Sequence, residues 1–218
     1  MTSSTADTVD HPWFAWIWPA IAAHETQKMR DLRRENLAGL SGRVLEIGAG
    51  TGTNFQLYPE SVAQVVAVEP EQRLVGLARE AAATSTVPVE VTNRTVESFS
   101  ADQPFDAVVC SLVLCSVAEP DSVLRQLLSL LRPSGELRYL EHIATGGLRG
   151  RLQQFVDATT LWPRLAGNCH AHRYTEQAIR AAGFEIDETR TEVVMPAWIP
   201  VPVSEFVLGR ARPGSSPV

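Results

Sequence analysis

The residues of this chain best suited to chemistry are two acids that flank a glycine-rich turn. A short apolar run, Arg43 to Ile47, contains Glu46, and glycines follow it at positions 48, 50 and 52. A second apolar run ends in Glu69-Pro70, twenty-one residues after Gly48. Glycine lets a strand turn sharply beside a ligand, and an acid at the tip of the next strand can accept hydrogen bonds from a ribose. This pattern predicts a nucleoside site.

The details of the turn indicate the charge of the ligand. The glycine pattern is G-x-G-x-G with Thr53 after it, not the G-x-G-x-x-G that dinucleotide folds prefer. Glu46 lies in the strand just before the turn, where it would repel a pyrophosphate and attract a cation. S-adenosylmethionine has a sulfonium, an ammonium and no phosphate, so we expect this cofactor and disfavour a nicotinamide dehydrogenase. The alternative without a ligand is an ordinary strand and turn with a solvated Glu46.

Three further residues are candidates for moving a proton. Glu141-His142 follow an apolar run, and His170 lies in the segment Gly167-Asn168-Cys169-His170. Histidine accepts a proton near neutral pH, and ligands bind where parallel strands end. A structural role for either histidine remains the alternative. Cys169-His170-Ala171-His172 lacks a fourth ligand at a fixed spacing, and the three cysteines have no metal-type spacing, so we expect no metal site.

Apolar strand-like runs alternate with helix-like segments, which is typical of an α/β fold with a mostly parallel sheet covered by helices on both faces. We predict strands and helices in this order: a helix at 20–38, a strand at 43–47, a helix from about 53, a strand at 65–68, a helix at 71–83, a strand at 87–92, a strand at 105–110, a helix from an Asp121 N-cap to about 131, a strand at 136–143, a helix at 175–182, and strands at 184–191 and 204–210.

Composition limits the classes of function. The chain has 218 residues and a net charge of −6, with Lys28 as its only lysine, which argues against nucleic acid as the main partner. No apolar stretch reaches the roughly 20 residues that span a bilayer, and the first residues do not resemble a secretory signal. An odd number of cysteines indicates a reducing compartment, so we expect a cytoplasmic protein. Polar tails are predicted at 1–9 and 211–218.

The chain resembles the class I S-adenosylmethionine-dependent methyltransferases, whose fold is a Rossmann-like seven-stranded sheet. The resemblance covers roughly residues 40–210, and its most specific parts are Leu45 to Gly52, Glu69 and Leu130 to Glu136. Ser111 to Val117, Leu140 to His142 and Ala166 to His170 are similar to the methyltransferase-like thiol S-methyltransferases and their bacterial relatives. The resemblance divides the chain into an N-terminal helical lid at 10–40 and a cofactor-binding domain at 41–210.

The resemblance also implies roles for individual residues. Glu46 and the backbone of Gly48, Ala49, Gly50 and Gly52 hold the methionine end of the cofactor, and Glu69-Pro70 hold the ribose. Thr95, Val96 and Glu97 fall where the family contacts the adenine, although Thr95 stands where an Asp is usual. Ser111 and Leu112 lie beside the transferred methyl, and His142, Glu141 and His170 assist deprotonation.

The acceptor that the resemblance implies is a small, apolar molecule, with a thiol favoured. O- or C-methylation of a lipid, quinone or polyketide stays open, as does a cofactor-binding scaffold without catalysis. The aromatic residues at 13–18 are expected to form a lid for the acceptor or to pack without such a role, and the oligomeric state is not predicted.

Overall fold

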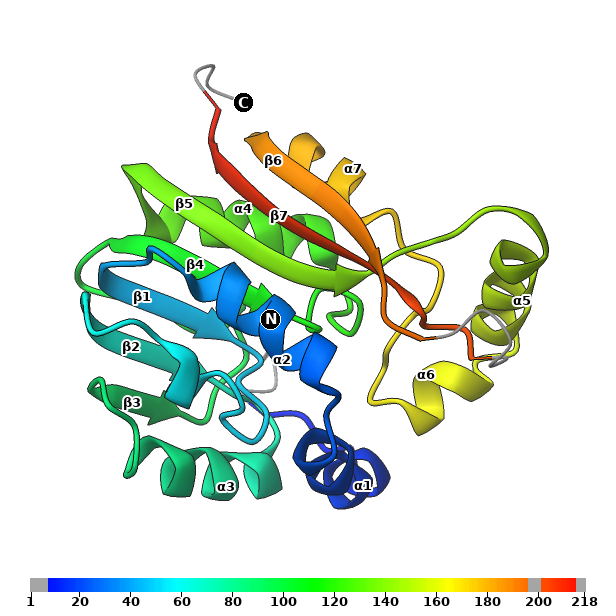
Figure 1. Cartoon of the computed structure of the whole chain (residues 1–218), viewed down its shortest axis with the longest axis horizontal. Helices are drawn as coiled ribbons and strands as arrows, with labels where there is room; N and C mark the ends of the chain where they lie inside the picture. The colour runs from blue at the N-terminus through cyan, green and yellow to red at the C-terminus, as the bar shows by residue number, and fades with distance from the viewer. Residues whose placement is uncertain (1–7, 196–200, 215–218) are drawn as a thin grey trace, which may run out of the picture.

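A seven-stranded sheet runs through the computed structural model, which describes residues 8–195 and 201–214 (Figure 1). The strand order is β3-β2-β1-β4-β5-β7-β6, and only β7 runs antiparallel to its two neighbours. The strands are β1 Gly42–Ile47, β2 Val62–Val68, β3 Val89–Thr92, β4 Phe105–Ser111, β5 Leu131–His142, β6 Phe184–Val193 and β7 Glu205–Pro213. The predicted fold class, a mostly parallel Rossmann-like sheet with helices on both faces, is confirmed.

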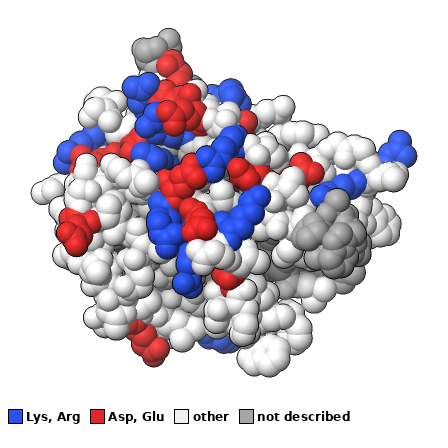
Figure 2. All heavy atoms as spheres, in the orientation of Figure 1, with Lys and Arg blue, Asp and Glu red and all other residues white. Residues whose placement is uncertain are grey.

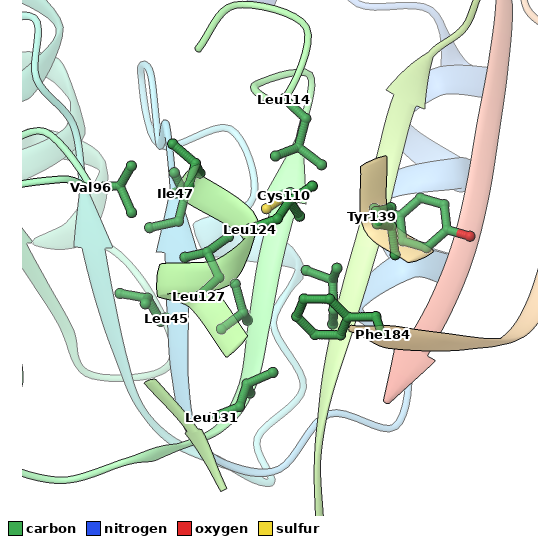
Figure 3. Packing of buried hydrophobic residues seen from close by; sticks show 14 of the residues in the cluster. Leu45, Ile47, Val96, Cys110, Leu114, Leu124, Leu127, Leu131, Tyr139 and Phe184 are labelled. Atoms are coloured by element: carbon green, nitrogen blue, oxygen red, sulfur yellow. The ribbon is translucent and has the colours of Figure 1, made fainter. Parts of the chain in front are cut away.

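Helices cover the sheet on both sides because its central strands are apolar on both faces (Figure 1). On one face, Leu45 and Cys110 of the sheet pack with Leu124 and Leu127 of α4, as Figure 3 shows, and with Ile179 of α7. The other face is covered by α2, α3 and the turn η1. The helices are α1 Pro12–Ala23, α2 Gln27–Leu37, α3 Gln72–Ala82, α4 Pro120–Leu130, α5 Gly147–Ala158, α6 Leu161–Leu165 and α7 Thr175–Ala181, with the 3-10 helix η1 Phe55–Leu57.

The direction in which the chain adds strands to the sheet reverses between β1 and β4. The chain passes from β1 outward to β2 and β3, then crosses back to β4 and β5 on the other side of β1. Loops that leave adjacent strands in opposite directions open a crevice at the carboxyl ends of those strands. The site should therefore lie where β1 and β4 end, at Ile47 and Ser111.

The elements differ from the prediction at several places, among them β5, which begins at Leu131 and not at 136. The single helix expected at 20–38 is two helices, because Thr26 caps a new helix by accepting a hydrogen bond from Met29 N. No α-helix follows the glycine turn. The 3-10 helix η1 ends at Leu57, and its C-cap residue Tyr58 has the extended backbone that the following Pro59 favours. Glu119, not Asp121, is the N-cap of α4. The segments α5 and α6 were not predicted.

The tails differ from prediction in the part that is described. Ala211 to Pro213 were assigned to a tail, but they belong to β7 and pair with β6, for example Ala211 with Ile186. Val9 forms an isolated parallel bridge with Glu71. Residues 1–7 and 215–218 of the predicted tails lie outside the described residues.

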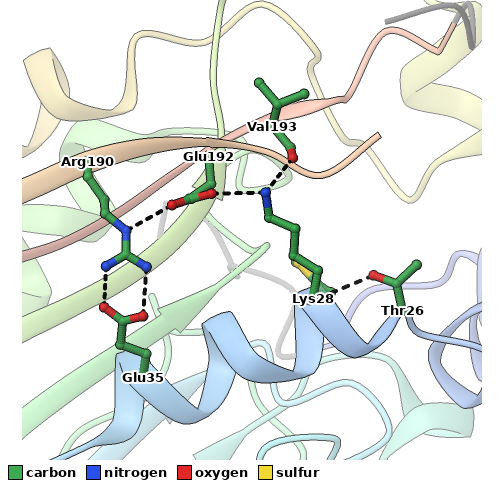
Figure 4. Close-up of polar contacts among 7 residues, drawn as sticks. Thr26, Lys28, Glu35, Arg190, Glu192 and Val193 are labelled. Atoms are coloured by element: carbon green, nitrogen blue, oxygen red, sulfur yellow. Dashed lines mark hydrogen bonds and ion pairs between the residues drawn. The ribbon is translucent and has the colours of Figure 1, made fainter. Parts of the chain in front are cut away.

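Ion pairs connect α2 to the β6 edge of the sheet (Figure 4). The Arg190 guanidinium contacts both carboxylate oxygens of Glu35, with an Nη2–Oε2 distance of 2.6 Å. Lys28 Nζ lies 3.0 Å from Glu192 Oε2 and donates to Val193 O at 2.7 Å. On the face that Figure 2 shows, basic and acidic side chains alternate over this region, so opposite charges neutralise one another. Among the helices at residues 8–195 and 201–214, none is both long and apolar enough to cross a membrane.

Candidate active site

The glycine turn after β1 has backbone angles and close contacts that residues with a Cβ atom rarely accommodate. Gly48, Gly50 and Gly52 have φ angles of 64°, 58° and 78°. A Cβ on Gly48 would lie 2.4 Å from a methyl of Val113, and one on Gly50 would lie 3.0 Å from the indole nitrogen of Trp18. The turn is therefore held between the β4–α4 loop and α1, and it offers its bare backbone to a ligand.

Glu46 is buried at 2% exposure beneath the turn, and both its oxygens are hydrogen bonded. Asn54 Nδ2 donates to Oε1 at 2.9 Å, and the Tyr58 hydroxyl donates to Oε2 at 2.7 Å. Burial raises the pKa of Glu46 to about 7, against the opposing effect of these two bonds and of the nearby Arg33. A cation in this position would favour the ionised carboxylate.

A small hollow joins Glu46 to the turn and to the end of β4. Six of the residues that line it are Trp18, Glu46, Gly48, Ala49, Gly50 and Ser111. Ser111 Oγ accepts a hydrogen bond from Asn54 Nδ2 at 3.2 Å, so one amide links the first and fourth strands. The structure thus brings together five of the predicted cofactor residues and adds Trp18. A larger hollow, between α4 and α7 and lined by Leu114, Leu124 and Arg173, contains neither the turn nor its acids.

Glu69 lies at the tip of β2 and is bonded to the turn itself. Its Oε2 accepts from Gly50 N at 2.7 Å and its Oε1 from Glu71 N at 2.9 Å. Burial raises the pKa of Glu69 above its ordinary value, against these two bonds. Pro70 continues the strand end, where its carbonyl accepts from Asn93 Nδ2 at 3.1 Å. A carboxylate has further lone pairs, so Glu69 can hold the turn and still accept from a ribose.

The segment predicted for the adenine follows β3 and turns toward α4. Val96 is buried, and its carbonyl accepts from Gln126 Nε2 of α4. Thr95 Oγ1 donates to Ser98 Oγ at 3.3 Å, while Glu97 is exposed. None of these three residues lines the hollow beside Glu46.

Leu112 and Glu141 shape the loop that leaves β4. Leu112 has a left-handed backbone with φ 61°, which is rare outside glycine, and its N–H donates to Leu140 O at 2.9 Å. Glu141 is fully buried, and its Oε1 accepts from Val113 N and Leu114 N, both at 2.9 Å. Burial raises the pKa of Glu141 against these bonds. The predicted proton acceptor Glu141 thus holds a loop backbone in place.

His142 is the last residue of β5, and its imidazole lies close to the sulfur atoms of two cysteines. Its Nε2 lies 2.8 Å from Cys169 Sγ, and Cys115 Sγ belongs to the same buried group, in which the three ligand-type atoms all lie within 4.8 Å of one another. We expected no metal-type arrangement of these cysteines. That expectation missed this cluster because Cys115, His142 and Cys169 come from three separate loops and strand ends, so no fixed spacing connects them.

His170 lies next to this cluster on the loop that follows α6. Its N–H donates to Cys115 O at 2.9 Å, and its side chain is partly exposed. Burial, followed by the charge of Arg173, lowers the pKa of the His170 imidazole below its ordinary value. The lowered pKa favours the neutral imidazole, which has one nitrogen able to accept a proton.

Helix α1 lies over both the turn and the cysteine loop. The rings of Phe14 and Trp18 stack at 5.2 Å between centroids. Trp18 faces Gly50, and a Cβ on Gly167 would lie 2.7 Å from the ring of Phe14. One helical turn of α1 therefore covers the glycine turn at one end and the loop of Cys169 at the other.

Sequence reasoning missed several residues of the site. Arg33 of α2 is 4% exposed; it donates to Asn54 Oδ1 at 3.1 Å and to Glu25 Oε1 at 2.6 Å. Asn54 and Tyr58 then connect this chain of bonds to Glu46. Asn54 and Tyr58 follow the glycine turn closely in the sequence, and this proximity could have identified them as candidates for the site. Arg33 could not be found this way, because only the packing of α2 brings it to the turn.

Known proteins share the sequence pattern and the fold of this chain. A family model described as a methyltransferase domain matches residues 21–189. Thiol S-methyltransferase TMT1B of Mus musculus is 34% identical over 215 residues, covering 91% of this chain and 85% of the relative.

Solved structures share the fold at low identity. The N-methyltransferase NodS of Bradyrhizobium japonicum WM9, in complex with S-adenosyl-L-homocysteine, has a TM-score of 0.63 at 16% identity, with 86% of each chain covered. The [4+2]-cyclase SpnF has a TM-score of 0.70 at 17% identity and covers 99% of this chain and 100% of its own.

Proposed function

We propose that this chain, which belongs to the methyltransferase domain family, binds S-adenosylmethionine at the turn after β1 and methylates the sulfur of a small thiol. The observation that carries the cofactor half is the buried carboxyl of Glu46 beside an open glycine backbone. Such a group favours a cationic nucleoside over a phosphate. The thiol half is supported by the thiol S-methyltransferase named above, which aligns with nine tenths of the chain.

Each part of the site has a role in this proposal. The backbone of Gly48, Ala49, Gly50 and Gly52, together with Glu46, holds the methionine end, and Glu69-Pro70 hold the ribose. The adenine lies toward Val96, with Thr95 and Glu97 at its edge, and Ser111 and Leu112 border the reacting methyl.

When bound, S-adenosylmethionine supplies a methyl group already activated by a positively charged sulfur. The protein therefore has to align the acceptor and exclude water, which can lower the barrier by about 7–11 kcal/mol. A thiolate is the reactive form of the acceptor, and an unperturbed thiol with a pKa of about 8.5 is only a few per cent ionised at neutral pH. His170 is placed to take up that proton, Glu141 positions the loop of Val113 and Leu114, and the Phe14–Trp18 stack closes the site.

The wider setting is part of the same proposal. The stacked rings of α1 favour an apolar acceptor. On the face that Figure 2 shows, basic and acidic side chains alternate and form no continuous basic patch for nucleic acid. Three free, buried cysteines suit a reducing compartment, so we place the protein in the cytoplasm.

Isothermal titration of the protein with S-adenosylmethionine tests the cofactor site. Glu69→Ala should weaken binding by at least about 100-fold, because a charged hydrogen-bond acceptor is lost and Gly50 N is left without its partner. Glu90→Ala, which removes an exposed acid from the adjacent strand β3, is the matched control and should bind as wild type does. Equal affinity in the Glu69 and Glu90 variants would remove the support for the site.

The acceptor is tested by supplying small alkyl thiols, aryl thiols, phenols and amines in parallel and measuring S-adenosylhomocysteine. We expect turnover with thiols. Methylation of phenols or amines alone would reject the thiol and favour the O-methylation alternative. Tight cofactor binding with no turnover of any acceptor would favour a scaffold or, as the cyclase of similar fold illustrates, another reaction.

A further inference from the structure

We propose that Cys115, His142 and Cys169 bind a Zn²⁺ ion whose open fourth position takes the sulfur of the acceptor thiol. The inference rests on the proposed thiol methylation for the identity of this fourth ligand, but the metal site itself rests on geometry alone. The three side chains are buried, at 2%, 4% and 9% exposure. Their ligand atoms lie within 4.8 Å of one another, close enough to contact one ion.

The ligand set and spacing suit zinc. Zinc binds thiolate sulfur at about 2.3 Å and imidazole nitrogen at about 2.0–2.1 Å, so tetrahedral ligands lie about 3.6–3.8 Å apart. The His142 Nε2–Cys169 Sγ distance of 2.8 Å has to open by less than about 1 Å to reach that value. Three protein ligands with one open position is the arrangement of catalytic zinc sites, and Cys₂His is one of their known ligand sets.

The backbone around the cluster is fixed by bonds that do not involve the sulfurs. Asn168 Nδ2 donates to Ser116 O at 2.7 Å, and His170 N donates to Cys115 O at 2.9 Å. Arg173 Nη1 donates to Leu114 O and Val117 O at 2.8 and 2.7 Å. The loops of Cys115 and Cys169 are thus held against each other before any ligand binds, which is what a preformed metal site requires.

Neighbouring groups match the charge of such a site. Zn²⁺ with two thiolates and a neutral imidazole has no net charge, and the acceptor thiolate brings it to −1. The half-buried guanidinium of Arg173 interacts electrostatically with both cysteines and can balance that charge. Trp162 Nε1–H points at Cys169 Sγ from 3.4 Å and stabilises a thiolate there.

The cluster also lies where an acceptor should. His142 ends β5 beside the end of β4, whose Ser111 borders the cofactor hollow. The Phe14–Trp18 stack touches Gly50 of the cofactor turn with one ring and Gly167, two residues before Cys169, with the other. The proposal therefore places the acceptor under this stack, between the glycine turn and the cluster.

The resulting step balances without a further reactant. The acceptor thiol loses its proton, through His170 to solvent, as its sulfur binds Zn²⁺. The thiolate sulfur then forms a bond to the methyl carbon, and the bond from that carbon to the cofactor sulfur breaks, with its electron pair returning to the now neutral sulfur. The product thioether is a weaker zinc ligand than a thiolate, so it leaves and the fourth position opens again.

The test measures metal directly. Protein freed of metal is titrated with Zn²⁺ alone against a chromophoric chelator, and Co²⁺ replaces it for absorption spectroscopy. We expect one ion per chain and the absorption of tetrahedral cobalt–thiolate bonds. Cys115→Ala, His142→Ala and Cys169→Ala should each weaken binding by more than about 100-fold. Cys110→Ala removes the other buried cysteine, which lies in the sheet core outside the cluster, and should bind the ion as wild type does.

The outcomes separate this inference from the proposed function. A thermal unfolding transition like that of the wild type shows that each variant is folded; a cysteine variant that fails this check is replaced by Cys115→Ser or Cys169→Ser. Three results would overturn the metal site even if thiols are methylated: failure of wild type to bind Zn²⁺, retention of the ion by folded cluster variants, or a Cys115–Cys169 disulfide in the active protein.

The open fourth position is tested separately. Addition of a thiol should change the cobalt spectrum; an unchanged spectrum would reject the open position. A protein that binds Zn²⁺ but methylates no thiol retains the metal site and loses the proposed function.

Discussion

The carboxyl group of Glu46 is buried beneath the glycine turn, where burial raises its pKa to about 7. At neutral pH it is therefore about half ionised in the absence of a ligand. A cationic ligand stabilises the ionised form, so binding and loss of the proton are coupled. Below pH 7, binding of the cation requires that the Glu46 carboxyl first lose its proton. Above pH 7 this carboxyl is already ionised and can interact with the cation directly.

The affinity for S-adenosylmethionine is therefore predicted to fall as the pH is lowered from 8 to 6, by at most about tenfold per pH unit for one proton. Glu46→Gln should weaken binding at pH 8 by about 10- to 100-fold, since a charged partner is lost, and should flatten the pH dependence. Isothermal titration at several pH values measures both effects. Glu60→Gln, an exposed acid before β2, is the control. A Glu46→Gln protein with the wild-type slope would assign the proton to another group.

Helix α1 carries four aromatic side chains with two different environments. Trp18 and Phe14 stack over the glycine turn and the cysteine loop, whereas Trp16 is 72% exposed. The helix thus presents one face to the site and another to solvent. Two tryptophans on one helix form a matched pair for testing the lid.

Trp18→Ala should weaken cofactor binding and raise the KM for the thiol, by about 10-fold or more in each case, because burial of a large aromatic ring contributes more than about 1.4 kcal/mol. Trp16→Ala should leave both constants within about twofold, since exposed substitutions change little. Titration and steady-state kinetics measure these values. Parallel losses in the two variants would show that α1 contributes only general stability.

Helix α2 is fastened by two kinds of ion pair. Arg33 and Glu25 form a pair at 2.6 Å whose side chains are 5% and 9% exposed, and Arg33 also donates to Asn54 beside the site. The Arg190–Glu35 pair to β6 is about half exposed on both sides. Removing one partner of a buried ion pair leaves the other charge buried without a counter-charge, which is strongly destabilising. Exposed pairs contribute little to stability, because solvent screens their charges.

Arg33→Ala should lower the free energy of unfolding by about 3–5 kcal/mol, and Glu35→Gln by less than about 1 kcal/mol. Urea denaturation of both variants measures these differences. Because Arg33 holds Asn54, its loss should also weaken cofactor binding, a readout that Glu35→Gln should leave unchanged. A loss in the Glu35 variant as large as that in the Arg33 variant would contradict this assignment.

For the molecule as a whole, burial raises the pKa of three carboxyl groups at one end of the sheet, Glu46, Glu69 and Glu141. In each case the folded state binds protons more tightly than the unfolded state. Stability therefore falls as the pH rises from the unfolded pKa, near 4.3, through the folded pKa values, the one at Glu46 being about 7.

The free energy of unfolding is predicted to decrease between pH 5 and pH 7.5, by up to about 1.4 kcal/mol per pH unit for each proton involved. Saturating S-adenosylmethionine should reduce this decrease, because a bound cation favours the ionised Glu46. Chemical denaturation across this range, with and without the cofactor, measures the effect. Stability that increases with pH over this range would show that other groups dominate.

The sequence determined the fold class and predicted the acids that the structure places around the glycine turn. Glu46 and the glycines belong to one strand and the turn that follows it, and Glu69 follows the next strand. Because these strands are neighbours in both sequence and sheet, the order of the residues along the chain indicated that they lie close together. Apolar runs revealed the strands because a parallel sheet is buried on both faces. The break in the helix at Thr26 and the short turn η1 were missed because capping and proline effects act over only a few residues.

Only the tertiary structure decided which residues meet at the other end of the site. Cys115, His142 and Cys169 follow one another at intervals of twenty-seven residues, on a loop, a strand end and a second loop. They meet because β4 and β5 are neighbours and because the loop after α6 bonds to the backbone of Cys115 and Ser116. Strand order and long-range backbone bonds set such distances, and neither is written in the spacing of residues along the chain.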